Sequence, residues 1–143
     1  MEIMIKKGII LAGGSGTRMS PITKAVNKQL LPLYDKPLIF YPLSVLMLVG
    51  IKDILIIVNK GQLSQFRRIL PEKNNLGIKI QYKEQLKPDG LPQAFKIGEK
   101  FIGKDNVSLI LGDNFFFGQS LTKIFKNNIN LKSGAKIFVH PVK

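Results

Sequence analysis

The 143-residue sequence predicts a three-layer α/β domain, in which helices cover both faces of a mostly parallel β-sheet. Short apolar runs alternate with amphipathic stretches, which is the pattern of a parallel sheet with crossover helices. The length fits one domain, and two polar, glycine-containing loops, Gly13–Arg18 and Gly112–Asp113, directly follow apolar runs. Because ligands in such folds bind beyond the carboxyl ends of the strands, we expect the chemistry in these two loops.

Five apolar runs are expected to form strands. Lys7–Ala12 is short, apolar and ended by glycines, as a buried strand is. Asp53–Val58 is rich in β-branched residues, and Ile78–Lys83 alternates apolar and polar residues as an edge or half-buried strand does. The last two predicted strands are Val107–Leu111 and Ala135–Val139.

The amphipathic stretches predict four helices. The first, Tyr41–Val49, has a proline near its first turn, and Gly50 stands where a C-terminal cap belongs. It lies in the most apolar segment, Leu38–Ile51, which is shorter than the roughly 20 residues that span a bilayer, so we expect a buried helix and no membrane contact. The other predicted helices are Gln62–Leu70, Leu91–Ile102 and Leu121–Asn128.

Composition narrows the functional class. The formal net charge is +13, yet the lysines are scattered without a run of five like charges or an RNA-binding aromatic motif. We therefore expect a solvated basic surface rather than a nucleic-acid interface. The chain has no cysteine, which excludes a disulfide framework and thiolate metal sites and fits a cytoplasmic protein. The single histidine, His140, is expected to be structural or exposed.

The loop Gly13-Gly14-Ser15-Gly16-Thr17-Arg18 has the composition of a phosphate-binding turn. Glycines let backbone N–H groups approach an anion closely, and the Arg18 guanidinium is a permanently charged fork that matches phosphate. The loop is not a Walker loop, which requires Gly-Lys-Ser/Thr, nor a dinucleotide fingerprint, which requires glycine where Met19 stands. Taken alone, it is equally compatible with an ordinary glycine-rich turn after a strand.

Four sequence blocks in one order resemble the signature of the sugar-1-phosphate nucleotidyltransferase family. The blocks are Gly14-x-Gly16-Thr17-Arg18-x-x-Pro21-x-Thr23, Lys28-Gln29-Leu30-Leu31-Pro32-x-Tyr34-Asp35-Lys36-Pro37, Tyr82-Lys-x-Gln85-x-x-Pro88-Asp89-Gly90-Leu91-x-Gln93-Ala94-Phe95, and Leu111-Gly112-Asp113-Asn114-x-Phe116-x-Gly118. The second block resembles the glucose-1-phosphate thymidylyltransferase branch of the family in particular. Met19-Ser20, Asn27 and Pro92 depart from that branch, in which serine is common at the position of Asn27.

The resemblance implies how a nucleoside triphosphate and its metal would be held. The first loop would bind the triphosphate through Gly13, Gly14, Ser15, Gly16 and Thr17. The catalytic residues would be Arg18 and Lys28, which neutralise phosphate charge. Asp113 would carry Mg²⁺, and a carboxylate just past a buried strand is a usual hard-oxygen ligand for that ion.

The resemblance also implies how the base would be recognised. Gln29 would lie at the nucleotide end of the pocket, and Gln85 with the backbone of Gly90 would read the thymine edge. A glutamine suits a pyrimidine edge because its amide offers a donor and an acceptor together.

Several of these residues have simpler interpretations when each is taken alone. Lys28 could be a surface lysine, Asp113 could cap the following helix, and Gln85 could be a solvated residue at a strand end. The run Phe115-Phe116-Phe117 is expected to pack in the core beneath its loop rather than to stack on bases.

The activity implied by the resemblance is Mg²⁺-dependent transfer of a nucleotidyl group from dTTP to glucose-1-phosphate, which gives dTDP-glucose and pyrophosphate. Residues 1–143 match about the first half of the family's length. We therefore expect a nucleotide-binding part that lacks the sugar-binding part and a second metal carboxylate, and that self-associates as a homo-oligomer. Two alternatives stay open: UTP, CTP or GTP as the donor, and a nucleotide-binding module without turnover.

Overall fold

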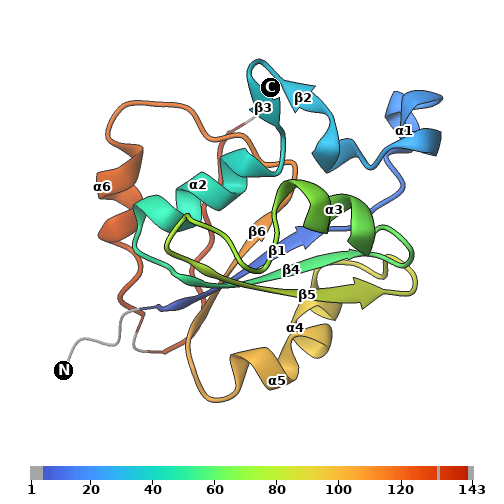
Figure 1. Cartoon of the computed structure of the whole chain (residues 1–143). Helices are drawn as coiled ribbons and strands as arrows, with labels where there is room; N and C mark the ends of the chain where they lie inside the picture. The colour runs from blue at the N-terminus through green and yellow to red at the C-terminus, as the bar shows by residue number, and fades with distance from the viewer. Residues whose placement is uncertain (1–4, 132, 142–143) are drawn as a thin grey trace.

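The computed structural model describes residues 5–131 and 133–141 of the chain (Figure 1). Within them, the main sheet has four strands, all parallel, in the order β5-β4-β1-β6. These strands are β1 (Lys7–Ala12), β4 (Asp53–Asn59), β5 (Lys79–Gln85) and β6 (Val107–Leu111). A separate antiparallel hairpin, drawn at the top of Figure 1, consists of β2 (Pro32–Leu33) and β3 (Lys36–Pro37).

The strand order creates a topological switch point beside β1. The chain runs from β1 outward through β4 to β5, and β6 then returns to the opposite side of β1. β1 and β6 pair in register up to Leu11 and Leu111, and the Gly112 N–H donates to the Leu11 carbonyl at 2.9 Å. The loops that leave β1 and β6 therefore start side by side, at the place where open α/β sheets bind ligands.

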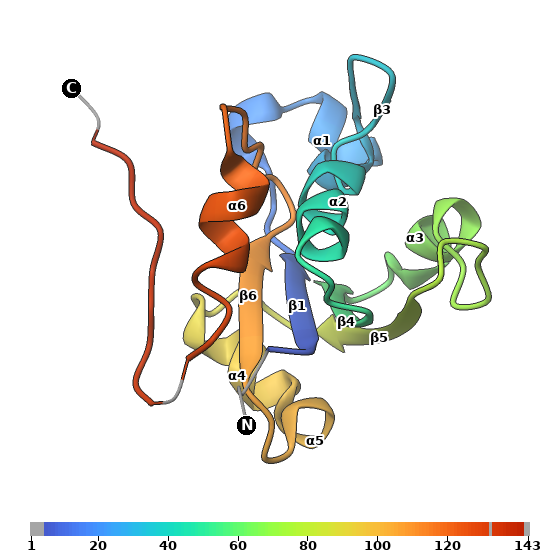
Figure 2. The same cartoon turned by 90° about the vertical axis from the view of Figure 1, so that its left-hand side faces the viewer.

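Helices cover both faces of the sheet, as the sequence predicts (Figures 1 and 2). One face carries α2 (Phe40–Leu48) and α3 (Leu63–Ile69), and the other carries α4 (Pro92–Ile97) and α5 (Glu99–Ile102). α6 (Leu121–Lys126) lies beside α2. The remaining short elements are the 3₁₀ turns η1 (Thr17–Met19) and η2 (Lys28–Leu30) and the helix α1 (Ile22–Ala25).

The alternation of side chains along the strands builds two core layers. On β4, Ile54, Ile56 and Val58 belong to the layer beneath α2 and α3, whereas Leu55 and Ile57 belong to the layer beneath α4. All five are fully buried. A strand buried on both faces explains why this segment is an unbroken apolar run.

The predicted elements are confirmed with two exceptions. Four of the predicted strands and all the predicted helical segments occur in the described residues, with ends displaced by one or two positions. The segment Leu91–Ile102 is two helices rather than one, because Gly98 ends α4 and α5 then begins. Gly98 is buried, and a Cβ there would lie 2.9 Å from Ile9 Cδ1 and 3.3 Å from Leu55 Cδ2, so the break between the helices sits where α4 and α5 pack closely on the sheet.

The predicted strand Ala135–Val139 is wrong. This segment pairs with no strand of the described chain, and its side chains are exposed, with Ile137 at 79%. A groove of about 750 Å³ separates it from β6, which lines the other wall. Figure 2 shows the segment running outside α6 and β6. β-branched residues predict a strand only where a neighbour is within hydrogen-bonding reach, and here the groove keeps the neighbour away.

None of the helices in the described part of the chain has the length and apolarity that crossing a bilayer requires.

Replacing Gly98 by alanine is expected to destabilise the fold by about 1–3 kcal/mol, although alanine is the better helix former. The new Cβ would lie 2.9 Å from Ile9 Cδ1 and 3.0 Å from the Ala94 carbonyl oxygen. Urea unfolding measures the change. The control is Lys96→Ala on the exposed side of α4, where about 0.5 kcal/mol or less is expected. An unchanged stability of Gly98→Ala would contradict the close packing of α4 on the sheet.

Candidate functional site

The loop after β1 has glycines at positions that disfavour a side chain, either through the backbone conformation or through lack of space. Gly14 and Gly16 have φ angles of 103° and 57°, in the left-handed region that favours glycine. Gly13 has an ordinary φ but no space, because a Cβ there would lie 1.5 Å from Gln85 Nε2. The Thr23 hydroxyl donates to the Gly16 carbonyl at 2.8 Å and holds the far end of the loop.

Asn59, the last residue of β4, joins this loop to β5. Its Nδ2 donates to the Gly14 carbonyl at 2.8 Å, and its Oδ1 accepts from the Gly14 N–H at 3.1 Å. The same Oδ1 accepts from Gln85 Nε2 at 3.1 Å. Gln85 is 3% exposed, so the interpretation of it as a solvated strand-end residue is wrong.

Sequence reasoning missed Asn59. The predicted strand ends at Val58, one residue too early, and no motif includes the position. The position of Asn59 could have indicated a role, because ligand sites in such folds occur at the carboxyl ends of buried parallel strands, where a polar residue is notable.

Gln29 lies between the loops that follow β1 and β6. Its side chain is 4% exposed, and its Nε2 donates to the Gly13 carbonyl at 3.4 Å. Its Cγ lies against Gly112, where a Cβ would come within 2.9 Å of it. Its Oε1 is buried without a hydrogen-bond partner in the described chain. A buried acceptor without a donor costs about 1–3 kcal/mol. Because this oxygen is sealed from solvent, a ligand donor could reach it only if the surrounding side chains moved.

Asn27 supports Gln29 from the preceding turn. Asn27 is 3% exposed, and its Oδ1 caps η2 by accepting from the Gln29 N–H at 2.8 Å. Its Nδ2 donates to the Ala12 carbonyl and to Gln62 Oε1. The asparagine that departs from the family branch at this position thus ties η2 to the end of β1 and the start of α3.

Lys28 and Asp113 form an ion pair across the switch point. Lys28 Nζ lies 2.8 Å from Asp113 Oδ2, and each side chain is about one-third exposed (34% and 33%). Lys28 Cβ also lies beside Gly16, so the lysine connects the two loops. The N-cap of α6 is Ser120, so Asp113 does not cap that helix. Lys28, which taken alone could be a surface lysine, is paired and about one-third exposed, and its role toward phosphate stays a prediction.

The remaining predicted site residues lie on the solvent side of this cluster. Ser15, Thr17 and Arg18 are exposed along the loop that leaves β1. Within residues 5–131 and 133–141, Arg18 forms no ion pair. Gly90 has a φ of 77° in the exposed connection between β5 and α4. The nucleotide-binding and catalytic roles of all these residues stay predictions, since direct contacts join only some of them: Gly13, Gly14, Gln29 and Gln85 in one group and Gly16, Lys28 and Asp113 in the other.

The charged groups fit a magnesium ion that a substrate would hold. The described residues contain no group of three His, Cys, Asp or Glu side chains that could hold a metal by themselves. Asp113 is a single carboxylate whose Oδ2 already contacts Lys28. Magnesium in phosphoryl-transfer sites is bound by one or two carboxylates together with substrate phosphates. Asp113 could supply such a protein oxygen, with the remaining ligands coming from a bound nucleotide and solvent.

The three consecutive phenylalanines do not form core beneath the loop, contrary to the expectation. Phe115, Phe116 and Phe117 are 52%, 37% and 89% exposed. Phe115 packs edge-on against Tyr41 with ring centroids 4.8 Å apart, and Phe116 packs edge-on against Phe125 at 5.3 Å. The core position is unavailable to them because the run lies past the end of β6, beyond the sheet. His140 is exposed, as expected.

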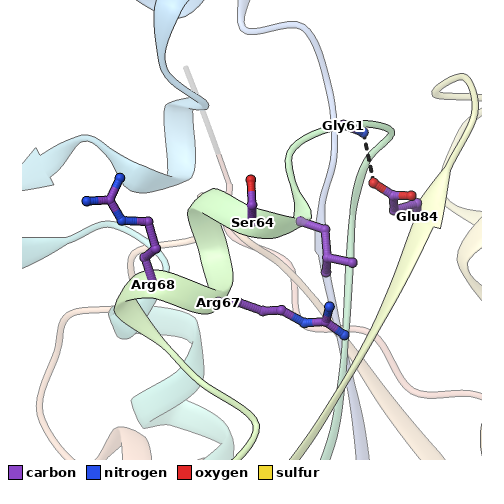
Figure 3. Close-up of a pocket in the computed structure, with 6 residues that line it drawn as sticks. Gly61, Ser64, Arg67, Arg68 and Glu84 are labelled. Atoms are coloured by element: carbon purple, nitrogen blue, oxygen red, sulfur yellow. Dashed lines mark hydrogen bonds between the residues drawn. The ribbon is translucent and has the colours of Figure 1, made fainter.

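A second hollow, of about 550 Å³, lies between α3 and β5 (Figure 3). Its lining includes Ser64, Arg67, Arg68 and Glu84, and the Glu84 carboxylate accepts from the Gly61 N–H at 2.8 Å. Arg67 pairs with Glu72 at 2.7 Å, and Figure 3 shows the guanidinium groups of Arg67 and Arg68 pointing in different directions. The two arginines therefore do not converge on one anion, and the hollow is wide open.

The chain matches known proteins over nearly its whole length. The model of the nucleotidyl transferase family matches residues 7–143. A glucose-1-phosphate thymidylyltransferase of Neisseria meningitidis is 58% identical over 137 residues, which cover 96% of this chain and 48% of the relative. One of Mycobacterium tuberculosis is 51% identical over 90% of this chain and 45% of the relative. The chain thus spans about half the length of the curated relatives it matches.

Solved structures agree with this result. A Bacillus anthracis protein assigned as a glucose-1-phosphate thymidylyltransferase, in complex with sucrose, superposes with a TM-score of 0.77 at 38% identity over 85% of this chain and 50% of that chain. A UDP-glucose pyrophosphorylase in complex with UDP-glucose superposes with a TM-score of 0.72 at 30% identity, over 88% of this chain and 52% of that chain.

Replacing Gly13 by alanine is expected to cost about 1–3 kcal/mol of stability, because the Gln85 amide must leave Asn59 to make room for the Cβ. In the double variant Gly13→Ala/Gln85→Ala the clash is gone, so we expect its destabilisation to fall about 1 kcal/mol or more below the sum of the single changes. Chemical denaturation of all four proteins measures this coupling. Strictly additive changes would show that the Gln85 amide does not occupy the space over Gly13.

Proposed function

This chain belongs to the nucleotidyl transferase family, and we propose that it carries the nucleoside-triphosphate site of a glucose-1-phosphate thymidylyltransferase. The complete protein would transfer a thymidylyl group from dTTP to glucose-1-phosphate, giving dTDP-glucose and pyrophosphate. The observation that carries the proposal is the meeting of a glycine loop, a lysine–aspartate pair and buried amides at the switch point of one sheet. The names of the relatives support the choice of dTTP as donor and glucose-1-phosphate as the sugar substrate.

The charged residues support the phosphate end of this site. Backbone N–H groups of the glycine loop would hold the triphosphate, and Arg18 and Lys28 would balance its negative charge. Lys28 is held in place by Asp113 at 2.8 Å, which orients the ammonium before a nucleotide arrives. A bound Mg²⁺, with Asp113 as its protein ligand, would add charge neutralisation on the phosphates.

No general base is needed in the proposed reaction. The nucleophile is a phosphate oxygen of the sugar-1-phosphate, which is already an anion, and it attacks the α-phosphorus as pyrophosphate leaves. The work of the protein is then to align the two substrates and to offset their charge. Gln29, Gln85 and the Gly90 backbone would hold the nucleoside at the other end of the site.

A second donor specificity has its own support. A UDP-glucose pyrophosphorylase shares 30% identity and the fold with this chain, and its solved structure contains UDP-glucose. Thymine and uracil present the same hydrogen-bonding edge and differ only by the 5-methyl group. UTP is therefore the alternative donor that the same Gln85 amide would accept.

Self-association is part of the proposal. In the described residues β6 has a strand neighbour on one side only, and a largely apolar groove runs along its other side. Open edges of this kind invite pairing with another chain, whereas the net charge of +13 opposes contact between two copies.

We expect dTTP with Mg²⁺ to raise the thermal stability of the chain more than ATP or GTP does. A ligand present at 100 times its Kd adds about 2.7 kcal/mol to the free energy of unfolding. Thermal melts with each nucleotide at equal concentration measure the difference. Equal shifts for all nucleotides would reduce the site to generic phosphate binding, and no shift with any of them would contradict the proposed function.

Asp113→Asn is expected to weaken the Mg²⁺ dependence of dTTP binding while changing stability by about 1 kcal/mol or less, because its ion pair with Lys28 is partly exposed. Titrating Mg²⁺ at fixed dTTP measures the effect. The matched control is Asp105→Asn, which removes the carboxylate that pairs with Lys7 at 2.7 Å, away from the glycine loop. Identical Mg²⁺ titrations for wild type and Asp113→Asn would exclude the metal role.

A further inference from the structure

We propose that Asn59 is a positioning residue that fixes the Gln85 amide with its carbonyl oxygen toward the incoming base, and so selects a base that presents a ring N–H. This inference rests on the proposed function for the presence of a base. It assigns a role to a residue that lies outside the four sequence blocks, and it gives a physical reason why thymine or uracil would be preferred to cytosine.

The orientation of Asn59 is set by backbone atoms. A backbone N–H can only donate and a carbonyl oxygen can only accept, so the two contacts with Gly14 allow one orientation of the Asn59 amide. Oδ1 faces the Gly14 N–H at 3.1 Å, and Nδ2 faces the Gly14 carbonyl at 2.8 Å. Rotating the amide by half a turn would place like groups against each other at both contacts.

The orientation of Gln85 follows from that of Asn59. The two residues are register partners at the carboxyl ends of β4 and β5, so their side chains are neighbours. Asn59 Oδ1 lies 3.1 Å from the Gln85 amide, which must therefore present Nε2 rather than a second oxygen. Burial of Gln85 to 3% exposure, with its amide lying on Gly13, leaves little room for another arrangement.

Gln85 Oε1 is then the atom left for a ligand. It makes no hydrogen bond in the described chain, and it is not among the side-chain atoms sealed from solvent without a partner. A fixed acceptor attracts the N3–H of thymine or uracil. Cytosine presents a lone pair at N3, so the same oxygen would repel it. The Gly14 backbone thus orients Asn59, and Asn59 orients Gln85, so that the site would prefer pyrimidines with an N3–H, which are thymine and uracil.

Binding of dUTP and dCTP tests the inference, since these two nucleotides differ only at the edge that Gln85 would read. Two variants of Asn59 are compared with wild type. Asn59→Leu removes the acceptor that holds Gln85 Nε2. Asn59→Asp keeps an acceptor for Gln85 Nε2 but loses the donor to the Gly14 carbonyl and adds a negative charge near the phosphates. The control is Gln62→Leu, which removes a neighbouring amide that hydrogen-bonds Asn27 rather than Gln85.

The measured quantity is the ratio of the Kd values for dCTP and dUTP. We expect Asn59→Leu to lower this ratio about fivefold or more, the discrimination that one well-placed base contact provides. Asn59→Asp should weaken both nucleotides while keeping the ratio, and Gln62→Leu should leave the ratio unchanged. A ratio that stays at the wild-type value in Asn59→Leu, with both affinities reduced alike, would mean that Asn59 only stabilises the loop and would overturn the inference.

A measurement without nucleotide separates this inference from the proposed function. Hydrogen exchange of the Gln85 side-chain NH₂, followed by NMR, should be protected in wild type and Asn59→Asp and unprotected in Asn59→Leu. Equal protection in Asn59→Leu would overturn the orienting role even if nucleotides bind. Failure of the wild type to bind either nucleotide would overturn the proposed function and base selection together, while the exchange data would still decide what Asn59 does to Gln85.

Discussion

The absence of a side chain at the carboxyl end of β1 is the condition on which the rest of the site depends. The Gln85 amide occupies the space that a Cβ on Gly13 would fill, and Gly112 lies so close to β1 that its Cβ would come within 3.0 Å of Ala12 Cα. Because of these two close contacts, the end of β5 and the loop after β6 both lie against the backbone at Ala12 and Gly13, at the end of β1. A side chain at either glycine would separate the groups that now converge, so the strand order alone would not make a site.

The sequence was sufficient for the parts of the fold that depend on local pattern. β4 is an unbroken apolar run because both its faces are buried, and the glycine loop is evident from composition. Contacts between segments that are distant in the sequence could not be predicted from local pattern. The role of Asn59 depends on register pairing with Gln85, and the failure of Ala135–Val139 as a strand depends on a groove beside β6. The residues around Asn59 do not show which residue of β5 it pairs with, and the residues of Ala135–Val139 do not show whether a partner strand is present.

The side chains at the two ends of the candidate site differ in how far they are fixed by contacts within the protein. At the buried end, Asn27, Gln29 and Gln85 are 3–4% exposed. The amides of Asn27 and Gln29 bond backbone groups, and the Gln85 amide bonds the Asn59 side chain. At the other end, Arg18 is exposed and the Lys28–Asp113 pair is partly open to solvent. Preorganised amides lower the cost of binding a base, whereas exposed cations can adjust to a flexible triphosphate chain.

Amide side chains at the buried end cost less free energy to bury than charged side chains would. An unpaired ion in such a position would cost far more than an amide, which can be satisfied by backbone groups that are already present. One amide is incompletely satisfied, because Gln29 Oε1 has no donor in the described chain. Gln85 Oε1 also has no hydrogen bond within the described residues, but unlike Gln29 Oε1 it is not sealed from solvent. Only Gln85 Oε1 could therefore meet a ligand without movement of the surrounding side chains, and a single fixed acceptor is complementary to a ligand group that brings a donor.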